Sequence, residues 1–203
     1  MVICGISILN SKLKELSEIG VKDSKKLSPD KRTNLAYLIK RKCISYKIAI
    51  VSVKEIDERI SRRITLNRLE ELKMAEIINE LGAEEIYIDA ADVNEARFGT
   101  SIRKLLNFNP KLIISEHKAD ERYPIVSAAS ILAKHERDSI IARLRDTYGD
   151  FGSGYTSDKK TINFLRQWIT ENKSIPSFVR SSWETTKILT NEILYNRKLT
   201  DFL

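Results

Sequence analysis

The stretch Ile86-Tyr87-Ile88-Asp89-Ala90-Ala91-Asp92 decides the fold, because an apolar, strand-forming run ends there on carboxylates. A second such segment, 111–115, is an apolar strand pattern followed shortly by His117-Lys118-Ala119-Asp120. Parallel strands end at a common edge of a sheet, and open α/β sheets bind their ligands at that edge. Asp89 and Asp120 are therefore candidate ligands of Mg²⁺ or Mn²⁺, which prefer hard oxygen donors.

Each aspartate also has a purely structural interpretation. Asp89 can start a turn, and Asp120 can interact favourably with the N-terminus of the helix that follows it. The run Ser127-Ala128-Ala129-Ser130-Ile131-Leu132-Ala133-Lys134 bears on this choice, because small residues let a helix approach a sheet closely. Such an approach would bring the loop that carries Asp120 toward the end of the Asp89 strand. Tight packing alone explains the same residues.

Strand patterns alternate with helix patterns along the chain, which predicts an α/β fold with much parallel pairing. We expect strands at 1–9, 45–53, 85–89 and 111–115, and helices at 29–40, 65–81, 124–148, 157–171 and 183–197. Ser28 followed by Pro29 favours a helix start, and Gly82 favours a helix end. Asp92-Val93-Asn94-Glu95 fits a capping box with Asp in place of Ser or Thr, before a helix to about Leu106.

A glycine-rich turn, Gly149-Asp150-Phe151-Gly152-Ser153-Gly154-Tyr155, interrupts this pattern. We therefore expect an α/β core over residues 1–155 and a small helical appendage over residues 156–203. Turns of this kind can expose backbone N–H groups to phosphate. Tyr155 can stack on a sugar or a base, or it can be a hydrophobic peg between core and appendage.

The composition favours a polyanionic partner. The 203 residues include 35 Lys and Arg against 28 Asp and Glu, for a net charge of +7, and basic surfaces attract phosphate backbones regardless of sequence. Cys4 and Cys43 have no zinc-like spacing and are expected to be small buried hydrophobes. No apolar run is long enough to span a membrane, so we expect a cytoplasmic protein with no membrane association. We also expect it to be a monomer.

Taken in order, these segments resemble the ribonuclease HII family, and its archaeal form most closely. The matching segments are 21–27, 87–94, 117–120, 127–134, 148–155 and 179–183. The resemblance covers nearly the whole chain. It implies a ribonuclease H-like mixed α/β sheet flanked by helices, with a small C-terminal helical appendage. It also implies an endonuclease that hydrolyses the RNA strand of RNA/DNA hybrids and ribonucleotides embedded in duplex DNA.

The resemblance also implies roles for individual residues. The family holds divalent metal with four carboxylates, two of which correspond to Asp89 and Asp120. One metal activates water and the other stabilises the leaving 3′-oxygen, about 4 Å away. Tyr155 would contact the sugar at the ribonucleotide junction. The remaining substrate contacts, which hold phosphates without reading sequence, would fall on Lys22, Ser24, Lys25 and Arg180.

The other two carboxylates of the family belong to an Asp-Glu-Ala-Gly-Arg-Gly motif on its first, central strand. The 203 residues contain no such motif, and residues 1–6 resemble the family's second strand. We therefore expect the central strand and two metal ligands to be missing. Three interpretations stay open: a metal-dependent nuclease with impaired activity, a catalytically inactive hybrid-binding module, and a truncated gene-model fragment.

Overall fold

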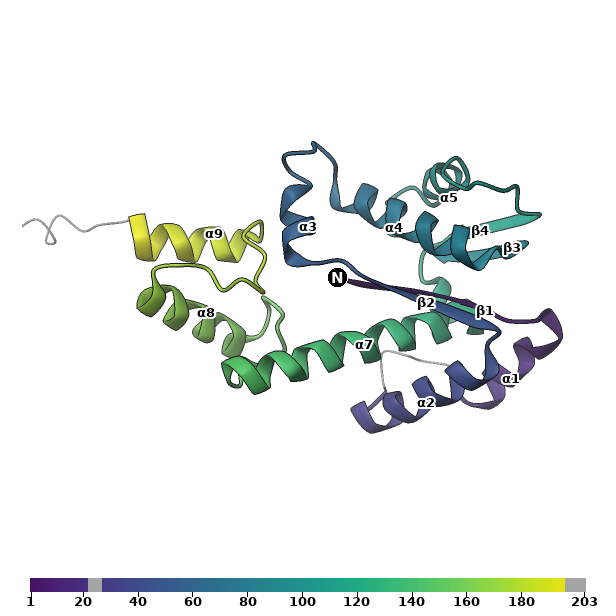
Figure 1. The fold of residues 1–203 in the computed structure, drawn as a ribbon, viewed down its shortest axis with the longest axis horizontal. Coiled ribbons are helices and arrows are strands. Elements are labelled where there is room, and N and C mark those ends of the chain that lie inside the picture. The colour runs from purple at the N-terminus through teal and green to yellow at the C-terminus, as the bar shows by residue number, and fades with distance from the viewer. Residues whose placement is uncertain (22–26, 196–203) are drawn as a thin grey trace, which may run out of the picture. The chain divides into compact units, whose positions relative to one another are not determined.

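The computed structural model describes residues 1–21 and 27–195 of the chain, which forms two compact units (Figure 1). Unit 1 comprises Met1–Val51 and Arg63–Asp138, and unit 2 comprises Ser52–Arg62 and Ser139–Leu203. Helix α7 (Pro124–Tyr148) contributes residues to both. The division at residue 155 into core and appendage stays a prediction, because compactness alone does not identify the catalytic part.

The first sheet of unit 1 pairs two antiparallel strands, β1 (Val2–Ser7) and β2 (Ser45–Ile50). One face lies against α4 (Leu66–Leu81), and the approach is close: a Cβ added to Gly5 would lie 2.5 Å from Ile77 Cγ2. On the opposite face, Ile6 packs in a core cluster with residues from three helices, α1 (Leu13–Glu18), α2 (Pro29–Lys42) and α7. A short 3-10 helix, η1 (Asn10–Lys12), precedes α1.

The second sheet of unit 1 pairs two parallel strands, β3 (Glu85–Asp89) and β4 (Leu112–Glu116). Helix α5 (Glu95–Arg103) lies on this sheet so closely that a Cβ on Gly99 would come 2.9 Å from Ser115 Cβ. The core of this layer combines strand and helix residues, namely Ile86, Ile88, Phe98 and Ile102.

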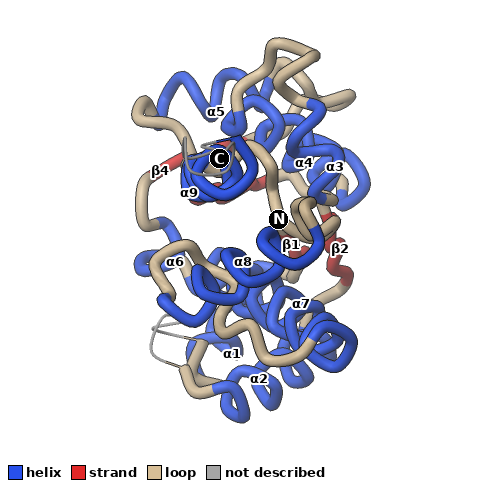
Figure 2. The backbone as a smooth tube through the Cα atoms, turned by 90° about the vertical axis from the view of Figure 1, so that its left-hand side faces the viewer, coloured by secondary structure: helices blue, strands red, loops and turns tan. Residues whose placement is uncertain are grey.

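The two sheets share no strand within the described residues, and the short strands lie among helices (Figure 2). A cavity of about 380 Å³ is lined by β1 from one sheet and β3 from the other, together with α4 and α7. Its lining is mostly aliphatic, and Asp89 lies at it. The mixed α/β fold with flanking helices agrees with the prediction.

Several predicted helix ends are confirmed. The Ser28 side chain accepts a hydrogen bond from Lys31 N at 3.4 Å at the start of α2. Gly82, with φ of 61°, ends α4 in the left-handed conformation that glycine adopts without a steric penalty. Helix α7 has the predicted bounds.

Three predictions about element ends are wrong. Asp92 does not cap α5; Asn94 does, accepting from Arg97 N at 2.8 Å, because the Asp92 carboxylate instead pairs with the Arg97 guanidinium at 2.6 Å. Helix α5 also ends at Arg103 rather than near residue 106. The predicted strand at 45–53 stops at Ile50, since Ser52 caps a helix that sequence analysis missed, α3 (Val53–Glu58).

Unit 2 is helical. Besides α3 it contains α8 (Lys159–Asn172), α9 (Glu184–Thr190) and a π-helix, η3 (Asn191–Tyr195). The predicted helix at 183–197 therefore divides into α9 and η3, and its last two residues lie outside the described part. The core of unit 2 is formed by Leu165, Ile169, Val179 and Leu189. A second cluster is aromatic and contains Tyr148, Phe151, Phe164, Trp168 and Phe178.

Candidate active site

Asp89 and Asp120 are brought together in unit 1. Asp89 is the last residue of β3, and Asp120 lies in the short helix α6 (Ala119–Arg122) that follows β4. The backbone N–H of Ala119 donates a hydrogen bond to Asp89 Oδ1 at 3.1 Å. The Asp89 carboxylate thus contacts the residue next to Asp120, which confirms the proximity predicted from the small-residue helix.

Helix α7 begins two residues after α6 ends and is closely packed at its start. Ser127 and Ala128 are fully enclosed, and the Ser127 hydroxyl donates to the carbonyl of Val21. These small side chains let α7 pack closely at its N-terminal end, immediately after α6. Asp120 is buried, with 8% of its surface exposed, whereas Asp89 is exposed. One carboxylate is therefore held inside the protein and the other is open to solvent.

Glu116 is an acidic neighbour that sequence analysis did not single out. The parallel register places it opposite Asp89 at the end of β4. Its carboxylate accepts from the Arg122 guanidinium at 2.7 Å and from the Tyr123 hydroxyl at 3.3 Å. Burial, together with the Glu116 charge, raises the pKa of Tyr123. The position of Glu116 depends on strand register, for which the sequence alone carried no signal.

The donor set at this sheet edge fits a hard divalent cation only in part. Asp89 and Asp120 supply oxygen atoms, the ligands preferred by Mg²⁺ and Mn²⁺. Among the described residues, no group of three or more His, Cys, Asp or Glu side chains is placed to hold a metal. Mg²⁺ usually keeps several waters and takes one or two protein carboxylates plus phosphate oxygens, which is compatible with the pair found here.

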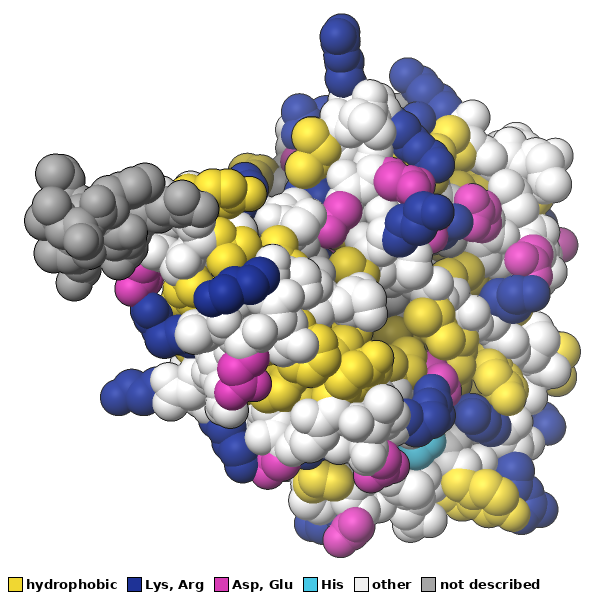
Figure 3. Space-filling model, turned by 60° about the vertical axis from the view of Figure 1, so that its left-hand side comes forward, with side chains coloured by type: hydrophobic (Ala, Val, Ile, Leu, Met, Phe, Trp, Pro, Cys, Tyr) yellow, Lys and Arg dark blue, Asp and Glu magenta, His cyan; other side chains and the backbone are white. Residues whose placement is uncertain are grey.

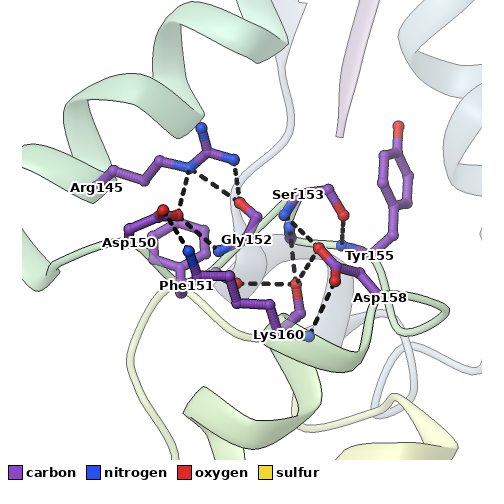
Figure 4. A network of polar contacts seen from close by, with 10 residues as sticks. Arg145, Asp150, Phe151, Gly152, Ser153, Tyr155, Asp158 and Lys160 are labelled. Carbon is purple, nitrogen blue, oxygen red and sulfur yellow. Dashed lines mark hydrogen bonds and ion pairs between the residues drawn. The ribbon is translucent and has the colours of Figure 1, made fainter.

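Tyr155 lies in unit 2, at the tip of the glycine-rich turn (Figure 4). Its side chain points away from the polar contacts beneath it, and the residue is 54% exposed. This exposure shows that the Tyr155 side chain is not part of the hydrophobic core of unit 2. Gly149, Gly152 and Gly154 have φ of 82°, 82° and 74°, so the turn uses a backbone conformation that other residues rarely adopt.

The polar contacts beneath the turn centre on Asp158 and Thr161, which sequence analysis also missed. Asp158 Oδ2 accepts from Ser153 N at 2.7 Å, and Oδ1 accepts from Lys160 N at 2.9 Å. The hydrogen bond from Ser153 is the main cause that lowers the pKa of Asp158 to about 2. The buried Thr161 hydroxyl donates to Phe151 O at 3.0 Å and accepts from Gly154 N at 3.1 Å. A signal was available, because an aspartate directly before a helix often caps it.

Arg180 also lies in unit 2, with its guanidinium carbon 5.5 Å from the centre of the Trp183 ring. The two residues that follow it are tethered to Asp57, whose carboxylate accepts from Ser181 N at 2.8 Å and from Ser182 N at 3.2 Å. These bonds outweigh partial burial and lower the pKa of Asp57. The remaining predicted substrate residues, Lys22, Ser24 and Lys25, lie outside the described residues.

The positive charge is dispersed on the face that Figure 3 shows. On the face in Figure 3, Lys and Arg side chains are scattered among Asp and Glu and do not form a single stripe. Many are paired with carboxylates, as in Lys47 with Glu80 and Arg166 with Glu192. On this face the net charge of +7 is therefore not concentrated in one basic patch.

The family model of ribonuclease HII matches residues 1–186. The chain belongs to the ribonuclease HII family. Ribonuclease HII of Pyrococcus furiosus is 46% identical to it over 195 residues, which cover 95% of this chain and 85% of that relative. Ribonuclease HII of Thermococcus sibiricus is 44% identical over 205 residues, covering 100% and 90%.

Solved structures of the family have the same fold. The ribonuclease H2 of Pyrococcus horikoshii OT3 superposes with a TM-score of 0.87 at 36% identity, covering 97% of this chain and 100% of that one. The ribonuclease HII in the PCNA complex from Archaeoglobus fulgidus gives 0.84 at 40% identity, covering 99% and 92%. Both comparisons confirm the ribonuclease HII fold and the archaeal resemblance. Within the described part of the chain, every helix is too short or too polar to span a bilayer.

Proposed function

We propose that the function of this protein is divalent-metal-dependent endonucleolytic cleavage of RNA/DNA hybrids, and of ribonucleotides embedded in duplex DNA, with Asp89 and Asp120 among its metal ligands and with impaired activity in the 203-residue chain. The observation that carries the proposal is the hydrogen bond from Ala119 N to Asp89 Oδ1, because it joins the two carboxylate-bearing elements at one sheet edge. Family membership supports the choice of reaction.

The two aspartates have different tasks in this proposal. Asp120 is held in α6 and offers a carboxylate of fixed position, while the Ala119 N–H orients the exposed Asp89 carboxylate. Bound Mg²⁺ or Mn²⁺ would polarise a phosphoryl oxygen and lower the pKa of a bound water. Phosphate oxygens of the substrate supply ligands of the same hard type as the carboxylates, so the exposed side of the pair is suited to a nucleic acid backbone.

The substrate contacts proposed for unit 2 come from Tyr155 and Arg180, and those of unit 1 from Lys22, Ser24 and Lys25. Tyr155 offers an exposed ring on a rigid turn, which suits stacking on a sugar or base. Arg180, Lys22 and Lys25 would neutralise phosphates, and the Ser24 hydroxyl would donate a hydrogen bond to one. Such contacts position a duplex without selecting its sequence.

Two carboxylates hold a pair of divalent ions poorly, because few protein oxygens then fix the geometry and balance the charge. The 203-residue chain is therefore expected to cleave hybrids weakly or not at all. A version that carries an added N-terminal strand with the sequence Asp-Glu-Ala-Gly-Arg-Gly is expected to cleave them in the presence of Mg²⁺ or Mn²⁺.

The test compares these two proteins on a labelled RNA/DNA hybrid and on a DNA duplex with one ribonucleotide, with EDTA as the control. Robust metal-dependent cleavage by the 203-residue chain would contradict the expected impairment. If the extended version binds hybrids but never cleaves them, the protein is a hybrid-binding module. If neither version binds a hybrid more tightly than plain duplex DNA, the proposed function is wrong.

A further inference from the structure

Asp158 forms hydrogen bonds with the backbone just before the exposed Tyr155 and with the backbone of Tyr155 itself. Its carboxylate accepts from Ser153 N at 2.7 Å, two residues before Tyr155. Its own N–H donates to the Tyr155 carbonyl at 3.1 Å. These two hydrogen bonds connect Asp158 back to Ser153 and to Tyr155, so residues 153–158 form a small loop that carries Tyr155 at its tip. Asp158 makes both of these bonds.

The loop is seated directly on this carboxylate. A Cβ added to Gly152 would lie 2.5 Å from Asp158 Oδ2 and 3.1 Å from Lys160 Cβ, so the backbone at Gly152 packs against the Asp158 side chain. Two further hydrogen bonds attach the turn to neighbouring helices. Gly154 N donates to the buried Thr161 hydroxyl of α8 at 3.1 Å, and Arg145 Nε of α7 donates to Gly152 O at 2.9 Å.

The Tyr155 side chain points away from the polar contacts of the loop in Figure 4, and the residue is 54% exposed. An exposed aromatic side chain on a fixed backbone loses little conformational entropy when it stacks on a ligand, whereas a mobile turn must first be ordered. Base or sugar stacking on an aromatic ring is favourable for any nucleotide. A fixed turn should therefore strengthen the binding of a nucleic acid and increase the preference for a duplex with a ribonucleotide over plain duplex DNA.

We propose that Asp158 is a positioning residue, whose carboxylate holds the 152–155 turn so that the Tyr155 ring is presented to the sugar of a ribonucleotide in one orientation. This inference rests on the proposed function, since it takes a ribonucleotide-containing duplex as the ligand. Asp158 itself touches no substrate. Its loss loosens the turn and lowers the preference for a duplex that contains a ribonucleotide over plain duplex DNA.

The test uses Asp158→Asn, which keeps the size of the side chain but places an N–H₂ donor opposite Ser153 N or Lys160 N. Asp146→Asn is the matched control, because Asp146 is an exposed residue of α7 in the same unit. Asp158→Ser is the second variant; a serine can still cap α8 at Lys160 N but is too short to reach Ser153.

The first measurement is amide hydrogen exchange at Ser153 and Gly154 in the full chain without nucleic acid. Exchange is expected to accelerate about tenfold in both Asp158 variants, as a lost charge-assisted hydrogen bond implies, and to stay unchanged in Asp146→Asn. Unchanged exchange in folded Asp158→Asn would overturn the inference.

The second measurement is the ratio of the Kd values for plain duplex DNA and for the same duplex with one ribonucleotide. Asp158→Asn and Tyr155→Ala are each expected to lower this ratio, and the double variant is expected to match Tyr155→Ala alone, because the two act as one unit. Additive losses, or an unchanged ratio in Asp158→Asn, would reject the inference. If neither the 203-residue chain nor the version with the added N-terminal strand binds the ribonucleotide-containing duplex more tightly than plain duplex DNA, the proposed function itself is rejected.

Discussion

Asp89 and Asp120 show how differently two residues of one candidate site can be placed. Asp120 is buried in α6, whereas Asp89 is exposed and is tied to the same helix through Ala119 N. Sequence analysis could predict this pairing because strand ends and a run of small residues are visible in the chain. It missed Glu116 and Asp158, since the first depends on register and the second on how a turn folds back.

The Asp89 carboxylate is expected to be indispensable for cleavage. In the version with the added Asp-Glu-Ala-Gly-Arg-Gly strand, Asp89→Asn keeps the side-chain shape but removes the ligand charge. Activity should fall at least about 100-fold, because losing even an outer partner of a metal ligand costs about 10–100-fold. Cleavage rates at saturating Mg²⁺ measure the effect. Activity within a few-fold of the parent would show that Asp89 is only a turn residue.

Tyr155 and Phe151 form a matched pair of aromatic residues on one turn. Tyr155 is exposed, so Tyr155→Ala should leave the melting temperature nearly unchanged and weaken cleavage at a single embedded ribonucleotide in the motif-complete version. Phe151 is 3% exposed, and Phe151→Ala should destabilise the protein by about 3–5 kcal/mol. Thermal melts and cleavage assays on both variants separate the two roles. A large drop in melting temperature for Tyr155→Ala, with cleavage intact, would assign Tyr155 to the core.

The turn that carries Tyr155 should loosen in acid. The pKa of Asp158 is lowered from 3.8 to about 2 in the folded protein. A lowered pKa means that the ionised group stabilises the fold; its contribution is complete above about pH 4 and is lost as the pH falls toward 2. Amide exchange at Ser153, corrected for the intrinsic pH dependence of exchange, should therefore lose protection over this range. Protection that is constant down to pH 2 would contradict the assignment.

At the scale of elements, local patterns predicted most bounds and long-range contacts decided the rest. The Ser28 cap, the Gly82 stop and the whole of α7 follow from residues close in the chain. The start of α5 does not, because the Asp92 side chain binds Arg97 and leaves the capping position to Asn94. Sequence analysis missed helix α3 because the β-branched residues Val51 and Val53 extended the strand pattern into its first residue.

Gly5 in β1 shows how closely one element approaches another. Gly5→Ala should destabilise unit 1 by about 1–3 kcal/mol, because the new methyl group would overpack against Ile77 and Leu81 of α4. Urea denaturation of the variant measures this loss. Ser7→Ala, in the same strand, is the control and should change stability by less than about 1 kcal/mol. Equal stability of Gly5→Ala and the parent would mean that α4 can shift away from β1 at little cost.

At the scale of the whole molecule, family membership and fold agree with what the ordered motifs implied. Sequence analysis placed Asp89, Asp120 and Tyr155 in the α/β core and Arg180 in the helical appendage, whereas Tyr155 lies in unit 2 of the structure. Sequence analysis could not predict that residues 52–62 join that second unit, because this segment is distant in the chain and its partners, such as Ser181 for Asp57, are 124 residues away.

The gap between the two sheets of unit 1 has a consequence for folding cooperativity. Among the described residues the two sheets share no strand, so no ladder of hydrogen bonds couples them. Helix α4 packs on β1 and also contributes Met74 and Ile78 to the core of β3. The β1–β2 pair and the β3–β4 pair should therefore open as separate foldons, with different opening free energies. Native-state hydrogen exchange in low denaturant would resolve two groups of amides. A strand inserted between the sheets should merge them into one group, so that the unit unfolds in a single step.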